Sequence, residues 1–119
     1  MDVPKVSVLI PTYNYARFLP QAIESVLNQS FRDFELIIGD DNSTDTSSEV
    51  IRKFAAQDAR IRFSIHERNL GMVENWNWCL AQAKGLYVKY LFGDDFLLAT
   101  DALERLVQLI ESKPGIDLA

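Results

Sequence analysis

The sequence predicts an α/β protein whose mostly parallel β-sheet is covered by helices on both faces. Three observations support this class. Short apolar runs that end in turn residues indicate buried strands. Each run is followed by a stretch whose apolar residues recur at helical spacing. The 119 residues, 48% hydrophobic and 24% charged, match one globular domain. Strands that alternate with helices are joined by right-handed crossovers, which make the strands parallel.

The predicted strands are residues 6–10, 34–38, 61–65 and 86–92. Pro11 ends the first strand and Gly39 bounds the second. In residues 61–65 apolar and polar side chains alternate, which indicates one solvated face or a position at the edge of the sheet. The last residues, I-D-L-A, are typical of the opening of a fifth strand. We therefore expect residues 1–119 to be the N-terminal domain of a longer protein.

Each predicted helix has one apolar face. In chain order, the residues on these faces are Leu19, Ala22, Ile23, Val26 and Leu27; Val50, Ile51, Phe54 and Ala55; Val73, Trp76, Leu80 and Ala83; and Leu103, Leu106, Val107 and Ile110. Thr46 and Glu49 form a T-x-x-E capping box at the start of the second helix. On the third helix, Asn77 lies on the side of the apolar face, whereas Trp78 points to the surface or to an interface.

Composition and charge exclude several classes of protein. The formal net charge of −5 argues against a nucleic-acid partner, because such proteins need Lys and Arg to neutralise phosphates. No apolar run reaches the ~18 residues of a membrane span, and the start M-D-V-P-K shows no signal peptide. The single cysteine, Cys79, excludes an internal disulfide and fits a reducing compartment, with its side chain packed in the core. The expected location is the cytoplasm, or the cytoplasmic face of the membrane for a full-length protein.

Polar clusters follow three of the predicted strands. They are Thr12-Tyr13-Asn14, Asp40-Asp41-Asn42 and Gly93-Asp94-Asp95. The carboxyl ends of parallel strands share one edge of the sheet, where open α/β sheets bind ligands. Asp, Asn, Ser and Thr also form turns and helix caps. That simpler interpretation fits most of the loop after the second strand, but Asp40 lies too early to cap the following helix.

Two acidic clusters at one edge repel each other unless a positive group lies between them. Carboxylate oxygens suit Mn²⁺ or Mg²⁺, which retain waters and bind substrate phosphates as well. The residues alone therefore predict a metal-assisted phosphate or nucleotide site. Tyr13 is either a stacking surface for a base or a rim aromatic residue packed on the first helix.

Four motifs occur in order: V-S-V-L-I-P-T-Y-N, L-P-Q-A-I-E-S-V-L-N-Q-S, D-F-E-L-I-I-G-D-D-N-S-T-D and N-L-G-M-V-E-N-W-N-W-C-L-A-Q-A-K-G-L-Y-V-K-Y-L-F-G-D-D. Together they resemble glycosyltransferase family 2, which has the GT-A fold. The resemblance covers residues 6–111. It implies a Rossmann-like half that binds a nucleotide-diphosphate sugar, with the UDP form favoured.

The resemblance also implies roles for particular residues. Pro11, Thr12 and Tyr13 would border the base and the ribose. Asp40 would accept a hydrogen bond from the base. Asp41 would order the loop or touch the nucleotide.

The segment Phe92-Gly93-Asp94-Asp95 occupies the D-x-D position of the family. The resemblance implies that Gly93 borders the nucleotide and that Asp94 holds the Mn²⁺ or Mg²⁺ ion. The family form is often D-x-D-D, so Phe92 replaces the first acid, and both the ribose contact and the metal affinity are open to question. Asp95 either faces the acceptor or begins the next turn.

Two further residues, Asn77 and Arg68, have two interpretations each, and two others have one. Asn77 matches a family position, and we expect it to bond the backbone near the acidic loops rather than the substrate, because an unpaired buried amide is costly. Arg68 either reaches a diphosphate or lies in solvent at the surface. His66 is expected to be structural, and Trp76 to belong to the core.

The resemblance implies an inverting sugar transfer. A base deprotonates an acceptor hydroxyl, which attacks the anomeric carbon, while the metal neutralises the leaving diphosphate. In the family the base comes from the acceptor-binding half, which is absent from this chain, so the catalytic base is unassigned. We expect these residues alone to bind donor with little or no transfer. The expected partners are the donor and a carbohydrate or lipid-linked acceptor in polysaccharide biosynthesis, and a homodimer is a further option.

Two other classes of protein remain open. A non-catalytic interaction domain with a degenerate donor site would explain Phe92. A receiver-type signalling domain is also doubly wound, but it needs an acidic pair after the first strand, where this chain has P-T-Y-N.

Overall fold

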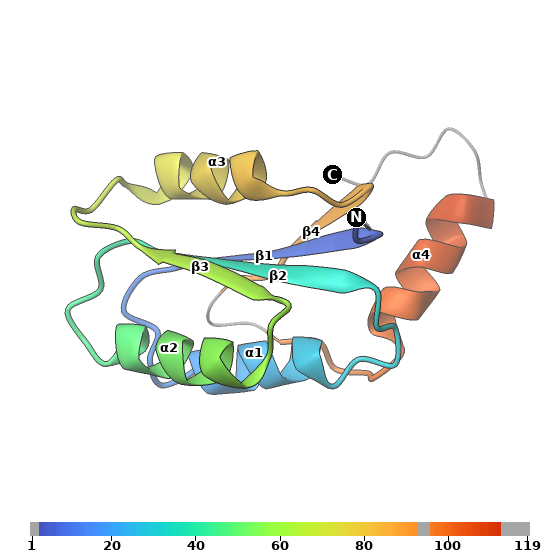
Figure 1. Ribbon diagram of the computed structural model, residues 1–119, viewed down its shortest axis with the longest axis horizontal. Helices are drawn as coiled ribbons and strands as arrows, with labels where there is room; N and C mark the ends of the chain where they lie inside the picture. The colour runs from blue at the N-terminus through green and yellow to red at the C-terminus, as the bar shows by residue number, and fades with distance from the viewer. Residues whose placement is uncertain (1–2, 93–95, 113–119) are drawn as a thin grey trace.

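The computed structural model describes residues 3–92 and 96–112. Its strands are β1 (Val6–Thr12), β2 (Phe34–Asp40), β3 (Ile61–Ile65) and β4 (Tyr87–Tyr90). They form one parallel sheet in the order β3-β2-β1-β4 (Figure 1). This confirms the predicted parallel α/β class and the edge position of β3. β2 runs further than predicted, and β4 is shorter.

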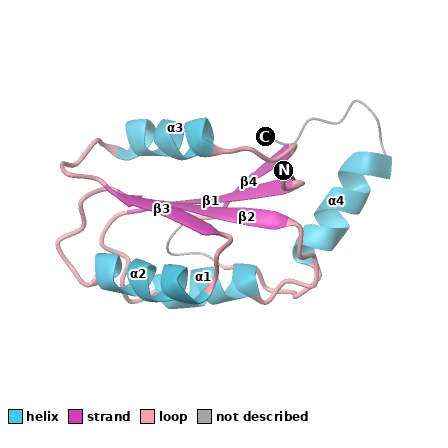
Figure 2. Cartoon of the chain, viewed as in Figure 1, coloured by secondary structure: helices cyan, strands magenta, loops and turns pink. Residues whose placement is uncertain are grey.

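Helices cover both faces of the sheet, as predicted. They are α1 (Leu19–Leu27), α2 (Ser47–Gln57), α3 (Met72–Gln82) and α4 (Ala102–Ser112). α1 and α2 lie on one face and α3 on the other, while α4 stands at the end of the sheet near the N-terminus (Figure 2). None of the helices in the described part of the chain is long and apolar enough to cross a membrane.

The two faces of the sheet bury very different amounts of apolar surface. Neighbouring strand residues point to opposite faces. The face under α1 and α2 holds the larger cluster: Val6, Val8, Ile10, Leu19, Ala22, Ile23, Val26, Phe34, Leu36, Ile38, Ile51, Ile61, Leu91, Leu103 and Val107. Under α3, the buried apolar cluster of the described residues consists of Leu9, Ile37 and Cys79. Fewer buried apolar side chains therefore lie on the α3 face of the sheet than on the face under α1 and α2.

β1 continues through Pro11 to Thr12, so the prediction that Pro11 ends the strand is wrong. Leu9 C=O accepts the Leu91 N–H at 2.7 Å on the β4 side, and Thr12 C=O accepts the Asp41 N–H at 2.9 Å on the β2 side. Alternate residues of a strand face the same neighbour, so Pro11 faces the β4 side as Leu9 does. Because β4 has ended there, the missing N–H of Pro11 breaks no ladder hydrogen bond.

α3 buries a different face from the predicted one. Val73 and Leu80 are 61% and 46% exposed, whereas Asn75 and Cys79, one turn apart, are buried. Gly39 on β2 is the cause, because a Cβ there would lie 2.7 Å from both Asn75 Oδ1 and Cys79 Sγ. Burial raises the pKa of the Cys79 thiol to about 12. Cys79 is therefore a packed, protonated side chain, as predicted.

The start of α2 also differs from its prediction. Thr46 precedes the helix but makes no side-chain cap hydrogen bond, so the capping box with Glu49 is wrong. Asp45 Oδ1 instead accepts the Ser47 N–H at 2.9 Å. An acid one residue earlier thus satisfies a free N–H of the first turn.

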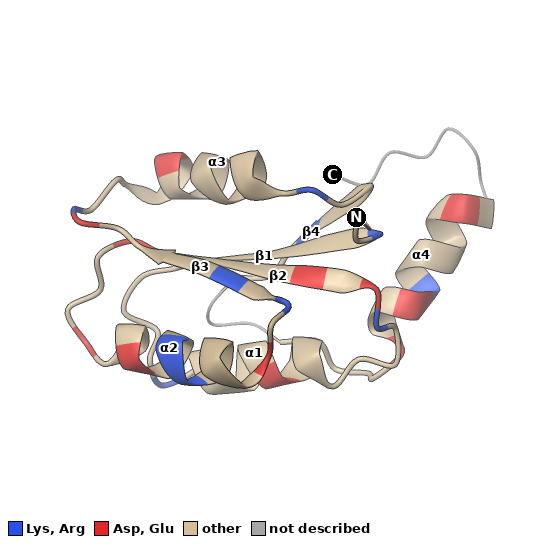
Figure 3. Cartoon of the chain, in the orientation of Figure 1, with Lys and Arg blue, Asp and Glu red and all other residues tan. Residues whose placement is uncertain are grey.

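A buried acid fixes the end of α3 to the sheet. Glu35 Oε2 accepts hydrogen bonds from Ser7 Oγ (2.6 Å) and the Lys84 N–H (2.7 Å). Its Oε1 accepts two from Arg62, from Nη2 at 2.7 Å and from Nε at 3.1 Å. Arg62 also donates to the C=O of Gln82, the last residue of α3, at 2.6 Å. In Figure 3 the acidic segment near the start of β2 lies beside the basic segment of β3.

The same contacts set the pKa of Glu35. Desolvation alone would raise this pKa, but the hydrogen bonds from Ser7, Lys84 and Arg62 outweigh it and hold the pKa below its ordinary value. A carboxyl with a lowered pKa stabilises the fold above its ordinary titration range. That contribution is lost as the pH falls through the folded-state pKa.

We expect Glu35→Gln to lower the free energy of unfolding by about 2 kcal/mol near neutral pH, because the Gln amide cannot accept all four hydrogen bonds. The difference from the wild type should be smaller at about pH 3, below the ordinary glutamate pKa of about 4.3, because protonation of the carboxyl removes the contribution of its charge. Urea unfolding at the two pH values measures it. Glu24→Gln, on the exposed face of α1, is the matched control. An equal loss at both pH values would contradict the role of the charge.

Candidate functional site

A cavity of about 570 Å³ opens at the carboxyl end of β1, beside the start of α3. It is lined by Pro11, Thr12, Tyr13, Tyr15, Asp41, Asn69, Met72, Asn75, Trp76 and Phe92. Its volume is typical of a small-molecule site. Parallel α/β sheets bind ligands at this edge, so the cavity lies where the sequence predicted a site.

Thr12 lines the cavity and carries a buried, unpaired hydroxyl. The residue is 2% exposed, and its Oγ1 has no hydrogen-bond partner among the described residues. A buried hydroxyl without a partner costs about 1–3 kcal/mol. A polar ligand atom that bonds Thr12 would remove this cost, so the hydroxyl is a candidate ligand contact.

Asp41 joins the cavity to the start of α3. Its Oδ1 accepts the Leu70 N–H at 2.6 Å, and its Oδ2 accepts the Gly71 N–H at 3.1 Å. Its C=O accepts a hydrogen bond from Asn69 Nδ2 at 3.2 Å. A carboxylate at a helix N-terminus is also favoured by the helix dipole. Asp41 therefore orders the turn that precedes α3, and its carboxylate remains at the cavity wall.

Asp40 has a different environment from Asp41. It is fully buried and is not among the residues that line the cavity. Its Oδ1 accepts a hydrogen bond from Ser43 Oγ at 2.6 Å, and its Oδ2 accepts the Ser43 N–H at 2.9 Å. Of the two acids, the structure brings Asp41 and not Asp40 to the cavity.

Asn75 makes the contacts that the sequence predicted for Asn77. Its Nδ2 donates to Gly39 C=O at 2.9 Å, and its Oδ1 lies 2.8 Å from His66 Nε2. His66 is buried, and its Nδ1 lies 3.2 Å from Ser64 Oγ. Asn77 is exposed instead, so the backbone-bonding role predicted for it is wrong. The cause is again Gly39, because its missing side chain leaves room for the Asn75 amide, which does not belong to the predicted apolar face.

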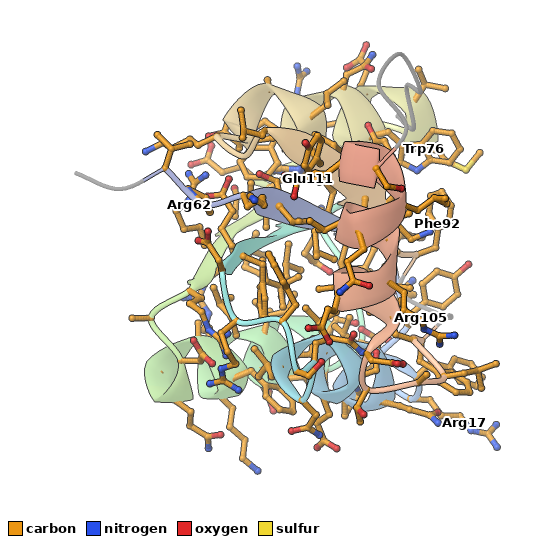
Figure 4. All side chains as sticks on the ribbon, turned by 90° about the vertical axis from the view of Figure 1, so that its right-hand side faces the viewer. Arg17, Arg62, Trp76, Phe92, Arg105 and Glu111 are labelled. Atoms are coloured by element: carbon orange, nitrogen blue, oxygen red, sulfur yellow. The ribbon has the colours of Figure 1, made fainter. Side chains whose placement is uncertain are left out.

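Aromatic side chains form one wall of the cavity. Trp76 and Phe92 lie with their ring centroids 5.2 Å apart (Figure 4). Tyr90 stacks on Phe92 at 6.2 Å and donates its hydroxyl to Trp76 C=O at 3.2 Å. Trp78, and not Trp76, packs on the apolar cluster under α3, so the predicted placement of the two tryptophans is wrong.

The remaining predicted site residues lie at the rim of the cavity, apart from it, or outside the described residues. Arg68 is exposed and borders a separate polar hollow beside His66. Gly93, Asp94 and Asp95 are not among the described residues. Tyr13 lies at the rim of the cavity and is 44% exposed.

No cluster of three or more His, Cys, Asp or Glu side chains that could hold a metal ion occurs within residues 3–92 and 96–112. The four carboxylate oxygens of Asp40 and Asp41 accept protein N–H and O–H groups. The hydrogen bonds of this acidic pair thus go to the protein's own loops. A metal role depends on Asp94, outside the described residues.

Sequence reasoning missed several residues of the cavity. They are Tyr15, Asn69, Met72, Asn75 and, as a cavity residue, Trp76. Asn69 belongs to the turn after β3, which ends at the same edge as β1 and β2. Applying the edge argument to the third strand would have included it.

The chain matches the model of glycosyl transferase family 2 over residues 7–118. It is 40% identical over 105 residues to an uncharacterized glycosyltransferase of Haemophilus influenzae, covering 88% of this chain and 42% of that protein. It is also 40% identical over 107 residues to the GalNAc(5)-diNAcBac-PP-undecaprenol beta-1,3-glucosyltransferase of Campylobacter jejuni, covering 89% and 34%. The chain thus spans less than half the length of these relatives.

Solved structures show the same fold. S. aureus TarS 1-349 in complex with UDP-GlcNAc is 25% identical with a TM-score of 0.83, covering 97% of this chain and 37% of that one. The mannosyltransferase PcManGT of Pyrobaculum calidifontis, in complex with GDP-Man and Mn²⁺, is 23% identical with a TM-score of 0.86, covering 98% and 34%. The family match, the relatives and the shared GT-A architecture together show that the chain belongs to glycosyl transferase family 2.

Proposed function

We propose that this chain forms the donor site of an enzyme that transfers a sugar from a nucleotide-diphosphate sugar to an acceptor hydroxyl. The observation that supports it most is the unpaired, buried hydroxyl of Thr12 in a cavity of nucleoside size. The carboxylate of Asp41 and the ring of Tyr13 lie at the same cavity. A planar base with donors and acceptors on its edge satisfies all three.

The proposed roles follow from position. Tyr13 stacks on the base from the rim, because a phenol ring offers a large apolar face. Thr12 and Asp41 bond polar atoms of the nucleoside. Each Asp41 oxygen accepts one backbone N–H in the structure, and a carboxylate has about four acceptor sites, so Asp41 can still accept a hydrogen bond from a base N–H.

UDP is the favoured nucleotide, because TarS, a relative in fold and sequence, is seen with UDP-GlcNAc. The undecaprenol-linked substrate in the name of the Campylobacter relative supports a carbohydrate or lipid-linked acceptor in polysaccharide biosynthesis. Such an enzyme would work in the cytoplasm or at its membrane face.

By the resemblance to the family, the transfer itself would be inverting. Asp41 is the one acid among the described residues that line the cavity, and both of its carboxylate oxygens already accept backbone N–H groups, those of Leu70 and Gly71. The base that deprotonates the acceptor would therefore come from elsewhere in the enzyme, and residues 1–119 alone would bind donor without turnover. A Mn²⁺ or Mg²⁺ ion held by Asp94 would neutralise charge on the leaving diphosphate.

We expect Thr12→Val to weaken UDP binding about tenfold and to leave the free protein as stable as before, or about 1 kcal/mol more stable, because it removes a buried hydroxyl that has no partner. Calorimetric titration of UDP and urea unfolding measure the two effects. Ser47→Ala is the matched control, since Ser47 Oγ is the second buried hydroxyl without a partner and lies outside the cavity. Unchanged UDP affinity in Thr12→Val would remove Thr12 from the site.

We expect Mn²⁺ to strengthen UDP binding at least about tenfold, since a divalent ion held by Asp94 would also attract the charged diphosphate. Asp94→Asn should remove this gain and leave the metal-free affinity unchanged. The measurement is the same titration with Mn²⁺ or with chelator. Asp33→Asn, at an exposed position, serves as the control. If Asp94→Asn keeps the full Mn²⁺ effect, the proposed ligand is wrong.

A further inference from the structure

The loops that follow β1 and β2 are joined by a set of hydrogen bonds, which we call the loop clasp and define as Asn14, Ser43, Thr44 and Asp45. The Asn14 N–H donates to Ser43 Oγ at 2.8 Å. Asn14 Oδ1 accepts the Thr44 N–H at 2.8 Å and the Asp45 N–H at 3.3 Å. One asparagine therefore binds the opposite loop through both its backbone and its side chain.

The clasp is anchored at both ends. Asp45 Oδ2 accepts the Ala16 N–H at 3.1 Å, which adds a second link between the loops. Ser43, which receives the Asn14 N–H, donates its own hydroxyl to the buried Asp40. A chain of hydrogen bonds thus runs from the interior of the sheet to an exposed loop. Asn14 has a φ of 55°, a left-handed conformation that asparagine tolerates.

The loop clasp lies next to the cavity, because Asn14 stands between two cavity residues in the chain. Asn14 does not line the cavity, but its neighbours Tyr13 and Tyr15 both do. Tyr13 is 44% exposed. The backbone that carries the two rings is held at Asn14, between them, and at Ala16, which follows Tyr15.

We propose that the loop clasp positions Tyr13 and Tyr15 at the cavity, and that Asp40 acts through it as a positioning residue rather than as a nucleotide contact. The effect on nucleotide binding rests on the proposed function. The positioning itself does not, because it is a property of the free protein. An ordered aromatic ring loses less conformational freedom when a ligand binds, so the clasp strengthens binding without touching the ligand.

The first test needs no ligand. The chain has four tyrosines, Tyr13, Tyr15, Tyr87 and Tyr90, so 3-fluorotyrosine labelling gives four ¹⁹F resonances that Tyr→Phe variants assign. Asn14→Gly keeps the left-handed backbone and removes Oδ1, and Ser43→Ala removes the hydroxyl link. Both should shift or broaden the Tyr13 and Tyr15 signals and leave those of Tyr87 and Tyr90 in place.

Two variants serve as controls. Asn14→Asp keeps an oxygen that accepts the Thr44 and Asp45 N–H groups, so it should retain the wild-type spectrum. Ser48→Ala, on α2 beside the loop, should have no effect. The proposal is overturned if Asn14→Gly leaves the Tyr13 and Tyr15 signals unchanged, if all four signals move together, or if Asn14→Asp perturbs them as much as Asn14→Gly does.

A double-mutant cycle with UDP as the probe tests the link to binding. Ser43→Ala should weaken UDP binding about tenfold in the wild-type background and by less than about twofold in the Tyr13→Ala background, because its effect passes through the ring. An equal loss in both backgrounds would overturn the proposed link. If the wild-type chain binds no UDP while the ¹⁹F result is as expected, the positioning stands and the proposed nucleotide function fails.

Discussion

The placement of α3 depends on buried acceptors at its two ends. Asp41 binds the N–H groups of the turn that begins the helix, and Glu35, through Arg62 and the Lys84 N–H, holds the segment where the helix ends. Between them, Asn75 bonds Gly39 C=O. The apolar cluster on this face is small, so these polar contacts supply what packing does not. Since α3 forms a wall of the cavity, the shape of the site depends on the same interactions.

These contacts change the interpretation of Asp40 and Asp41, the acidic pair after β2. Two adjacent carboxylates at the edge of a sheet suggest a cation, because like charges repel. Here each oxygen accepts a protein hydrogen bond, and the two acids point to different places: Asp40 to the loop after β2, and Asp41 to the start of α3. The group left without a partner at the cavity is neutral, the hydroxyl of Thr12. The need for a ligand is therefore more evident at the threonine than at the acids.

Periodicity was enough to predict the order and type of all eight helices and strands in the described part of the chain, because most of them bury regular apolar faces. It failed where a small or polar residue decided the packing. Gly39 admits Asn75 to the interior, so the buried face of α3 is not its most apolar one. Pro11 continues β1 because its neighbour β4 is short, a fact about pairing that no local pattern contains. The positions of Asp40 and Asp41 likewise depend on how the loops are placed, so the sequence does not reveal that Asp41, and not Asp40, lines the cavity.

The cavity divides into a polar floor and aromatic walls. Thr12, Asp41 and Asn75 provide the polar groups, and Tyr13, Trp76 and Phe92 provide rings. No Lys or Arg of residues 3–92 and 96–112 lines it. These residues suit a nucleoside, whose base has flat faces and a polar edge, and they supply no positive charge for a diphosphate. In the proposed donor site, these residues would recognise the base of the nucleotide rather than its charge. Compensation of a bound diphosphate would then come from outside these residues, which is the physical reason for proposing a cation at Asp94.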